Sequence, residues 1–139
     1  MAVVTGRLEV ESRGENDVVD LTGGVRRVVG KSGVKSGVVT VFVSGSTAAV
    51  TTLEFEPGLV KDFPEMLERV SPKGREYEHQ KTWNDGNGHS HVKAALVGPS
   101  LTIPVVNGDI AVGTWQQVVL VELDIRPRRR KIVVQVVGE

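Results

Sequence analysis

Hydrophobic and polar positions alternate over most of this chain, in short runs bounded by turn residues. Five runs predict strands, because a period of two places every second side chain on the same face of a sheet. They cover residues 38–43, 101–106, 110–112, 115–123 and 131–137. Asn107-Gly108 lies between two of these runs and predicts a two-residue hairpin turn, since both residues tolerate positive φ. The arginines at 128–130, next to Pro127, are expected to separate the last two strands and to lie in water.

Three stretches depart from this alternation. Residues 23–31 follow Thr22, a potential N-cap, and carry valines at spacings of three and four, which predicts a helix. Residues 57–70 have an apolar stripe at helical spacing, and Pro64 within it predicts a turn followed by a helix from about Phe63. Residues 91–96 follow Ser90 and fit either a short helix or a strand, so both remain open.

The composition supports a fold dominated by sheet. Of the 139 residues, 28 are valine and 16 are glycine, and β-branched side chains favour strands while glycine favours turns. A chain of this length usually forms one domain. We therefore expect residues 1–139 to be a single α+β domain, a mainly antiparallel sandwich-like fold with two or three short helices.

Charge and cysteine content narrow the possible partners. Basic and acidic residues balance at 17 each, so no general attraction to nucleic acid or to a membrane surface is expected. The absence of cysteine excludes disulfides, thiolate catalysis and cysteine-ligated zinc. No apolar run is long enough to span a membrane, and the first residues do not resemble a signal peptide, so a cytoplasmic location is expected.

All three histidines, His79, His89 and His91, lie within 13 residues of one another. In extended backbone His89 and His91 would share a face, whereas in a helix they would point apart. Together with His79, or with Asp85 or Glu78 as a third ligand, they predict a site for a divalent metal such as zinc or magnesium. The alternative is that these are solvated loop residues.

The same segment could bind an anion. Gly86 and Gly88 would let the backbone approach a ligand closely, and a helix beginning near Ser90 would direct free amides toward a phosphate. Lys93 would add a full charge. The turn at residues 44–47 could donate hydroxyl hydrogen bonds to phosphate oxygens, or simply end a strand.

Several separated motifs form one pattern: Gly86 to Ser100, Ile103-Pro104-Val105, Gly113 to Gln117, Glu122-Leu123-Asp124 and Arg126 to Arg130, preceded by Ser46 to Val50, Glu54, Asp62 and Tyr77-Glu78-His79. These motifs extend over nearly the whole chain. They closely resemble the YjbQ-like family, whose members are often described as secondary thiamine-phosphate synthases. The resemblance implies an α+β sandwich-like subunit that assembles into a homotrimer, with a polar cleft as its active site.

The resemblance also implies a weak thiamine-phosphate synthase activity, which joins a pyrimidine diphosphate to a thiazole phosphate and releases pyrophosphate. The expected partner is thus a small phosphorylated metabolite. The positions that match the family pattern are Thr47, His79, Asn87, His91, Trp115, Gln116 and Arg128. Gly45 departs from it, because the family usually has a histidine there.

The expected roles follow from the chemistry of such a reaction. Lys93, Arg128 and the amides around Gly88 would stabilise the departing pyrophosphate, since positive charge placed where leaving-group charge develops is a large catalytic contribution. Asn87 would orient the substrate, and His91 would exchange a proton.

Two further residues have two interpretations each. Glu54 is either a base or an ordinary surface carboxylate near a helix start. Trp115 either stacks on a heterocycle or lies in the core or in a subunit interface.

Other functional classes remain open. The chain could be a non-catalytic trimer that binds a metal or a phosphorylated metabolite, or it could be a metal-dependent hydrolase.

Overall fold

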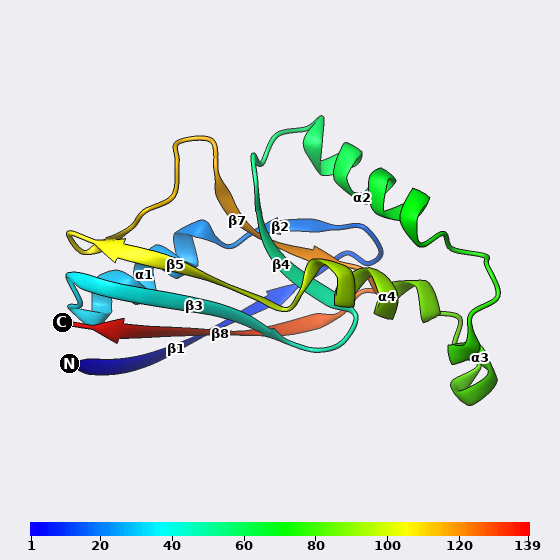
Figure 1. Ribbon diagram of the computed structural model, residues 1–139, viewed down its shortest axis with the longest axis horizontal. Coiled ribbons are helices and arrows are strands. Elements are labelled where there is room, and N and C mark those ends of the chain that lie inside the picture. Colours follow the sequence, from blue (N-terminus) through cyan, green and yellow to red (C-terminus); the bar gives the residue numbers. More distant parts are fainter.

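Two antiparallel sheets form the frame of the protein in a computed structural model that describes residues 1–139 (Figure 1). The five-stranded sheet has the order β1-β8-β3-β5-β6 and the three-stranded sheet the order β2-β7-β4. The strands are β1 (Ala2–Glu11), β2 (Val18–Asp20), β3 (Ser36–Ser44), β4 (Ala48–Leu53), β5 (Ser100–Val106), β6 (Asp109–Ile110), β7 (Gln117–Glu122) and β8 (Arg129–Gly138). The helices are α1 (Thr22–Ser32), α2 (Leu59–Val70), α3 (Glu78–Trp83) and α4 (Gly88–Val97). The predicted α+β, mainly antiparallel fold is confirmed, with four helices instead of two or three.

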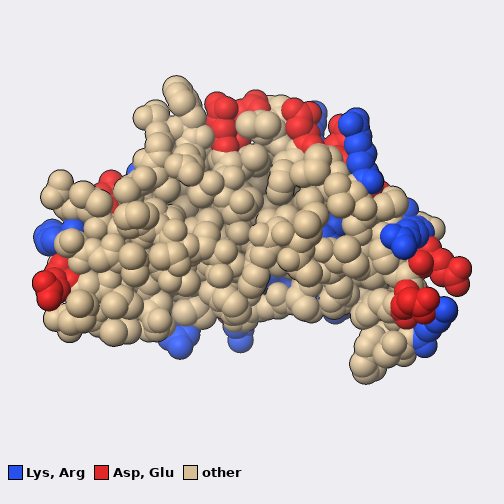
Figure 2. All heavy atoms as spheres, viewed as in Figure 1, with Lys and Arg blue, Asp and Glu red and all other residues tan.

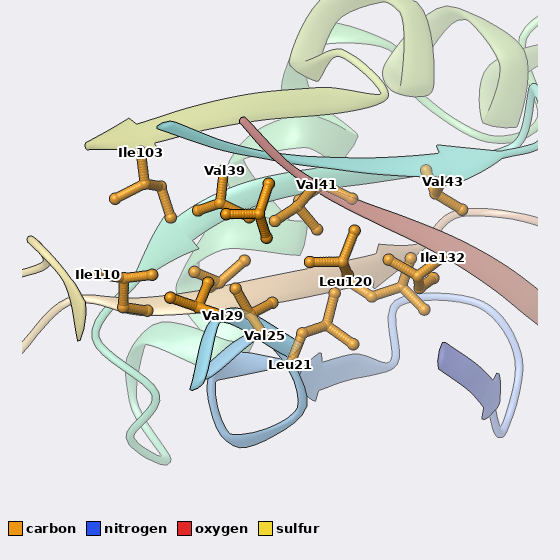
Figure 3. Close-up of a cluster of buried hydrophobic side chains, with 14 of the residues drawn as sticks. Leu21, Val25, Val29, Val39, Val41, Val43, Ile103, Ile110, Leu120 and Ile132 are labelled. Carbon is orange, nitrogen blue, oxygen red and sulfur yellow. The ribbon is translucent and has the colours of Figure 1, made fainter. Parts of the chain in front are cut away.

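The main core lies between the two sheets. Val39 and Val41 alternate inward from β3, and Leu120 of β7 lies opposite them (Figure 3). Val25 and Val29 of α1 complete the cluster, and all five side chains are fully buried. Burial of each contributes roughly 1.5–3 kcal/mol, which is why a chain so rich in valine forms this sandwich.

Helix α1 packs tightly against β1 because glycines allow the approach. A Cβ atom at Gly6 would lie 2.6 Å from Val28, and one at Gly24 would lie 2.7 Å from Leu8. The expected N-cap role of Thr22 was wrong. Its hydroxyl instead accepts a hydrogen bond from the amide of Val118 at 2.9 Å, so it fastens the helix to β7.

Helix α2 runs without interruption through Pro64, whereas a turn before about Phe63 was expected. Pro64 and Leu67 are buried, and Leu67 packs in a second cluster with Ala49 of β4 and Ala94 of α4. Burial of this face maintains the helix although a proline inside it forfeits one backbone hydrogen bond.

The hairpin prediction was correct. Asn107 and Gly108 have φ of 52° and 80°, and they connect β5 to β6 with Val106 opposite Asp109. The prediction that all three arginines lie in water was wrong for Arg130, which is 3% exposed. Strand β8 begins at Arg129, so alternation turns Arg130 inward.

The sequence patterns missed four elements, β1, β2, β4 and α3. Strand β2 has three residues and α3 has six, which is too short for a periodic signal.

Both termini lie at one end of the molecule and α3 at the other (Figure 1). Charged side chains surround a largely uncharged central area of the face in view (Figure 2). None of the helices has both the length and the hydropathy to cross a membrane.

Candidate functional site

Two of the three histidines meet at the junction of α3 and α4. The rings of His79 and His91 have centroids 4.5 Å apart and are tilted by 47°. The intervening turn reverses the chain at Asn84 and Gly86, which have φ of 51° and 72°, in the left-handed region that Asn and Gly tolerate best. The turn therefore brings together two residues that lie twelve positions apart.

Carboxylate and amide groups surround His79. Its Nε2 atom lies 3.1 Å from Oδ1 of Asp85 and 3.0 Å from the side-chain amide of Asn87. The Asn87 amide lies between Asp85 and Asp124, and its NH2 group can point to either carboxylate. In one orientation it donates to Asp85 at 2.7 Å, and in the other to Asp124 at 3.4 Å. Asn87 thus connects the imidazole pair to a buried carboxylate.

Asp124 follows strand β7 and is 2% exposed. It accepts hydrogen bonds from Thr47 Oγ1 at 3.0 Å, Arg128 Nη1 at 2.8 Å and the Ile125 amide at 2.8 Å. Burial by itself raises the pKa of Asp124, but these donors, Asn87 and the charge of Arg128 outweigh it and hold that pKa below its usual value. Asp124 is therefore a carboxylate at neutral pH.

A fully buried ion pair, between Arg130 and Glu122, adjoins Asp124. Arg130 Nε donates to Glu122 Oε1 at 2.8 Å, and Arg130 Nη2 donates to Thr47 Oγ1 at 2.8 Å and to Glu122 Oε2. Glu122 also accepts from Ser12 Oγ at 2.8 Å and from the amide of Asp124 at 3.1 Å. This network holds the strand ends of β7 and β8 in one arrangement.

His91 faces a cleft of about 370 Å³. The cleft is lined by Gly45, Ser46, Ala48, His91, Ala94, Ala95 and Pro99. Partial burial and the neighbouring His79 hold the pKa of His91 below its usual value, against the opposing attraction of Asp85 and Asp124. A neutral imidazole on a cleft wall can accept a proton from a ligand.

His89 does not join the other two histidines. Because the segment is the helix α4 rather than a strand, residues 89 and 91 point apart, and His89 is 1% exposed with its Nε2 atom 2.6 Å from Glu15. The expected three-histidine metal site is therefore not formed. No group of three or more His, Asp or Glu side chains is arranged to hold a metal ion.

Several residues expected to bind phosphate are engaged within the chain. Lys93 is 2% exposed and pairs with Glu68 at 2.8 Å, and the hydroxyl hydrogen of Thr47 is directed at Asp124. Ser90 is fully buried. Gly88 allows α4 to approach Tyr77, since a Cβ atom there would lie 2.6 Å from Tyr77 Cβ, and close packing therefore explains this glycine without a ligand.

The remaining candidates lie apart from the imidazole pair. Gln116 lines a separate cleft of about 380 Å³ between β4 and β5, which shares no residue with the one at His91, and it donates to Thr52. Trp115 is 73% exposed in the loop before β7, so the core interpretation was wrong. Glu54 is exposed after β4, and its carboxylate makes no hydrogen bond or ion pair.

Sequence reasoning missed three groups in this site. Arg130 was assigned to solvent, and Glu122 and Asp124 were noted only within a family motif. A signal was present, because acidic residues at 122 and 124 end an otherwise apolar run, and alternation places both on one face of the chain.

The fold and the cleft define a class of small α+β proteins with an imidazole pair beside a buried carboxylate. The family model described as UPF0047 protein YjbQ-like matches residues 6–139, and this chain belongs to that family. A UPF0047 protein of Methanothermobacter thermautotrophicus is 38% identical over 139 residues, which is 100% of this chain and 95% of that protein.

Solved structures agree with this assignment. A YbjQ-like protein of unknown function from Sulfolobus solfataricus superposes with a TM-score of 0.93 at 34% identity, covering 99% of both chains. A hypothetical protein from Aeropyrum pernix gives a TM-score of 0.88 at 35% identity, with 97% of this chain and 98% of the other covered. The family resemblance noted in the sequence is confirmed, and these relatives carry no assigned activity in their descriptions.

Proposed function

We propose that this protein is a group-transfer enzyme of the thiamine-phosphate synthase type, with the cleft at His91 as its active site. The observation that supports this most is a partly buried imidazole of lowered pKa on the wall of a cleft large enough for a small metabolite. The proposed ligand is a small phosphorylated metabolite, and we expect low turnover.

The reaction requires displacement of pyrophosphate. The thiazole nitrogen supplies the electron pair of the new C–N bond, while the C–O bond to the pyrimidine breaks and its electrons leave on pyrophosphate. Donors that face the leaving group stabilise the charge that develops there. The His91 imidazole can exchange a proton with pyrophosphate, and Asn87, fixed between Asp85 and Asp124, orients the polar groups around it.

Thiamine phosphate formation from the two precursors tests this function. We expect the parent protein to form it and His91→Gln to lower the rate about a hundredfold or more, in line with the usual contribution of general acid–base catalysis. Val92→Gln changes an exposed neighbour on the same helix and serves as the matched control. Equal rates in the parent and in His91→Gln would remove His91 from the mechanism, and no product from the parent would refute the proposed activity.

A second candidate is a non-catalytic homotrimer that binds a divalent metal or a phosphorylated metabolite. Its metal-binding form is favoured by the internal pairing of Lys93 and Thr47, which takes two expected phosphate-binding groups out of reach. Equilibrium dialysis with zinc tests the metal, for which His79 and His91 would supply two ligands, with no third side chain of this chain arranged to complete the site. Zinc binding that disappears in a His79→Ala/His91→Ala double variant would support the metal-binding form, and unchanged or absent zinc binding would refute that form.

A further inference from the structure

The guanidinium of Arg130 is held by a buried ion pair, but only some of its N–H donors make hydrogen bonds within the chain. Of its five N–H donors, the one on Nε is directed at Glu122 and the two on Nη2 are directed at Thr47 and Glu122. Nη1 makes no hydrogen bond within the chain. A charged side chain that is 97% buried therefore keeps two donors without a partner.

These two donors are accessible. The buried polar side-chain atoms that lack a partner are Gln80 Oε1 and Ser90 Oγ. Arg130 Nη1 is not among them although it has no partner, so it reaches solvent. Part of the small exposed fraction of Arg130 thus lies on Nη1, the end of the guanidinium that its ion pair leaves free.

Gly45 provides the opening. A Cβ atom at this position would lie 2.7 Å from Arg130 Nη1, so any side chain there would press against the atom that carries the donors. Gly45 also lines the cleft that His91 faces. The missing side chain at residue 45 therefore places the free Nη1 next to the proposed active site.

We propose that Arg130 Nη1, reached through the space in front of Gly45, binds an oxyanion group of the ligand in this cleft. Guanidinium N–H donors suit phosphate and carboxylate oxygens. Glu122, itself held by Ser12, and Thr47 fix the guanidinium in place beforehand, which avoids the cost of ordering a flexible arginine on binding. This deepens the proposed function, on which it rests, by naming the group that holds the substrate's phosphate.

Isothermal titration with inorganic phosphate, pyrophosphate and acetate tests this site. We expect phosphate and pyrophosphate to bind the parent, and Gly45→Ala to weaken them about tenfold to a hundredfold, the usual effect of losing a hydrogen bond to a charged group. Arg129→Ala removes the same charge from the neighbouring residue, which faces solvent and pairs with Glu11, and should leave the affinity unchanged. If acetate binds more tightly than phosphate, the ligand group that Arg130 Nη1 binds is a carboxylate and not a phosphate.

Arg130→Lys provides a second variant if Gly45→Ala does not fold. It retains the positive charge beside Glu122 but removes Nη1, and should weaken the same anions. The proposal is overturned if the parent binds none of the three anions, or if folded Gly45→Ala or Arg130→Lys binds phosphate as the parent does. Binding that depends on Gly45, without thiamine phosphate formation, would refute the proposed activity and leave this site standing.

Discussion

The ring of His79 lies against the ring of His91, with centroids 4.5 Å apart. Two imidazoles at this distance oppose each other's protonation, because the second proton would place two like charges side by side. Asp85 and Asp124 act in the opposite direction on His91. The protonation state of His91 therefore reports on the arrangement of the whole site.

We predict that His91 titrates below the usual histidine pKa of about 6.5 and is neutral at pH 7. His79→Gln should raise the pKa of His91, because it removes a like charge, and Asp85→Asn should lower it further, because it removes an attraction. NMR titration of the imidazole resonances measures both shifts. Shifts of the His91 pKa in the same direction in both variants would contradict the opposing effects of His79 and Asp85.

The same shift predicts a dependence of stability on pH. A histidine whose folded pKa lies below its unfolded value binds fewer protons in the folded state, so it lowers the free energy of unfolding as the pH falls below about 6.5. Chemical denaturation of the parent and of His91→Gln at pH 7.5 and pH 5.5 measures this. The parent should lose more stability than the variant, and an equal loss would contradict the lowered pKa.

Arg130→Met should destabilise the fold by about 3–5 kcal/mol, because it leaves Glu122 as a buried charge without its partner. The double variant with Glu122→Met should recover much of that loss. Arg129→Ala, whose partner Glu11 is exposed, should change stability little. Urea denaturation compares the three, and a mild effect of Arg130→Met alone would mean that Glu122 is not closed off from water.

Two glycines in helices should respond in opposite directions to alanine. Gly88→Ala places a Cβ atom 2.6 Å from Tyr77 Cβ, so Tyr77 and α4 must move apart, and stability should fall by about 1–3 kcal/mol. Gly30→Ala meets nothing within 4 Å in the interior of α1, and should stabilise by roughly 0.5–1 kcal/mol. Thermal unfolding measures both, and equal effects would contradict the close packing at Gly88.

The homotrimer remains a proposal, and the outer face of the five-stranded sheet is where we expect the contact. Val3, Val38, Phe42 and Val106 are exposed there, and register places Val38 next to Val137 and Pro104. Light scattering after size exclusion should give three times the 15.0 kDa subunit mass for the parent and a smaller mass for Val38→Lys. Met66→Lys on α2 should keep the parent's mass, and a monomeric parent would refute the trimer.

Much of the frame could be read from the chain. The alternating valines of β3 and β8 and the turn at Asn107-Gly108 are local patterns, and each appears where it was predicted. The alternation in β8 also predicts correctly that the side chain of Arg130 points inward. It was misread because a run of three arginines suggests solvent, and its counter-ion Glu122 is eight positions away in the preceding strand.

The sequence by itself determined that this is a valine-rich antiparallel α+β protein of the YjbQ-like family, with a polar segment around three histidines. It could do so because periodicity, turn chemistry and family motifs are carried by neighbouring residues. Only the tertiary structure decided which histidines meet. The helix α4 turns His89 toward Glu15 and His91 toward His79. Lys93, Thr47 and Arg130 likewise acquired their roles from partners that lie 25, 77 and 8 positions away, which no local pattern specifies. Burial makes that pairing necessary, since a polar group removed from water must find its partner wherever the fold supplies one.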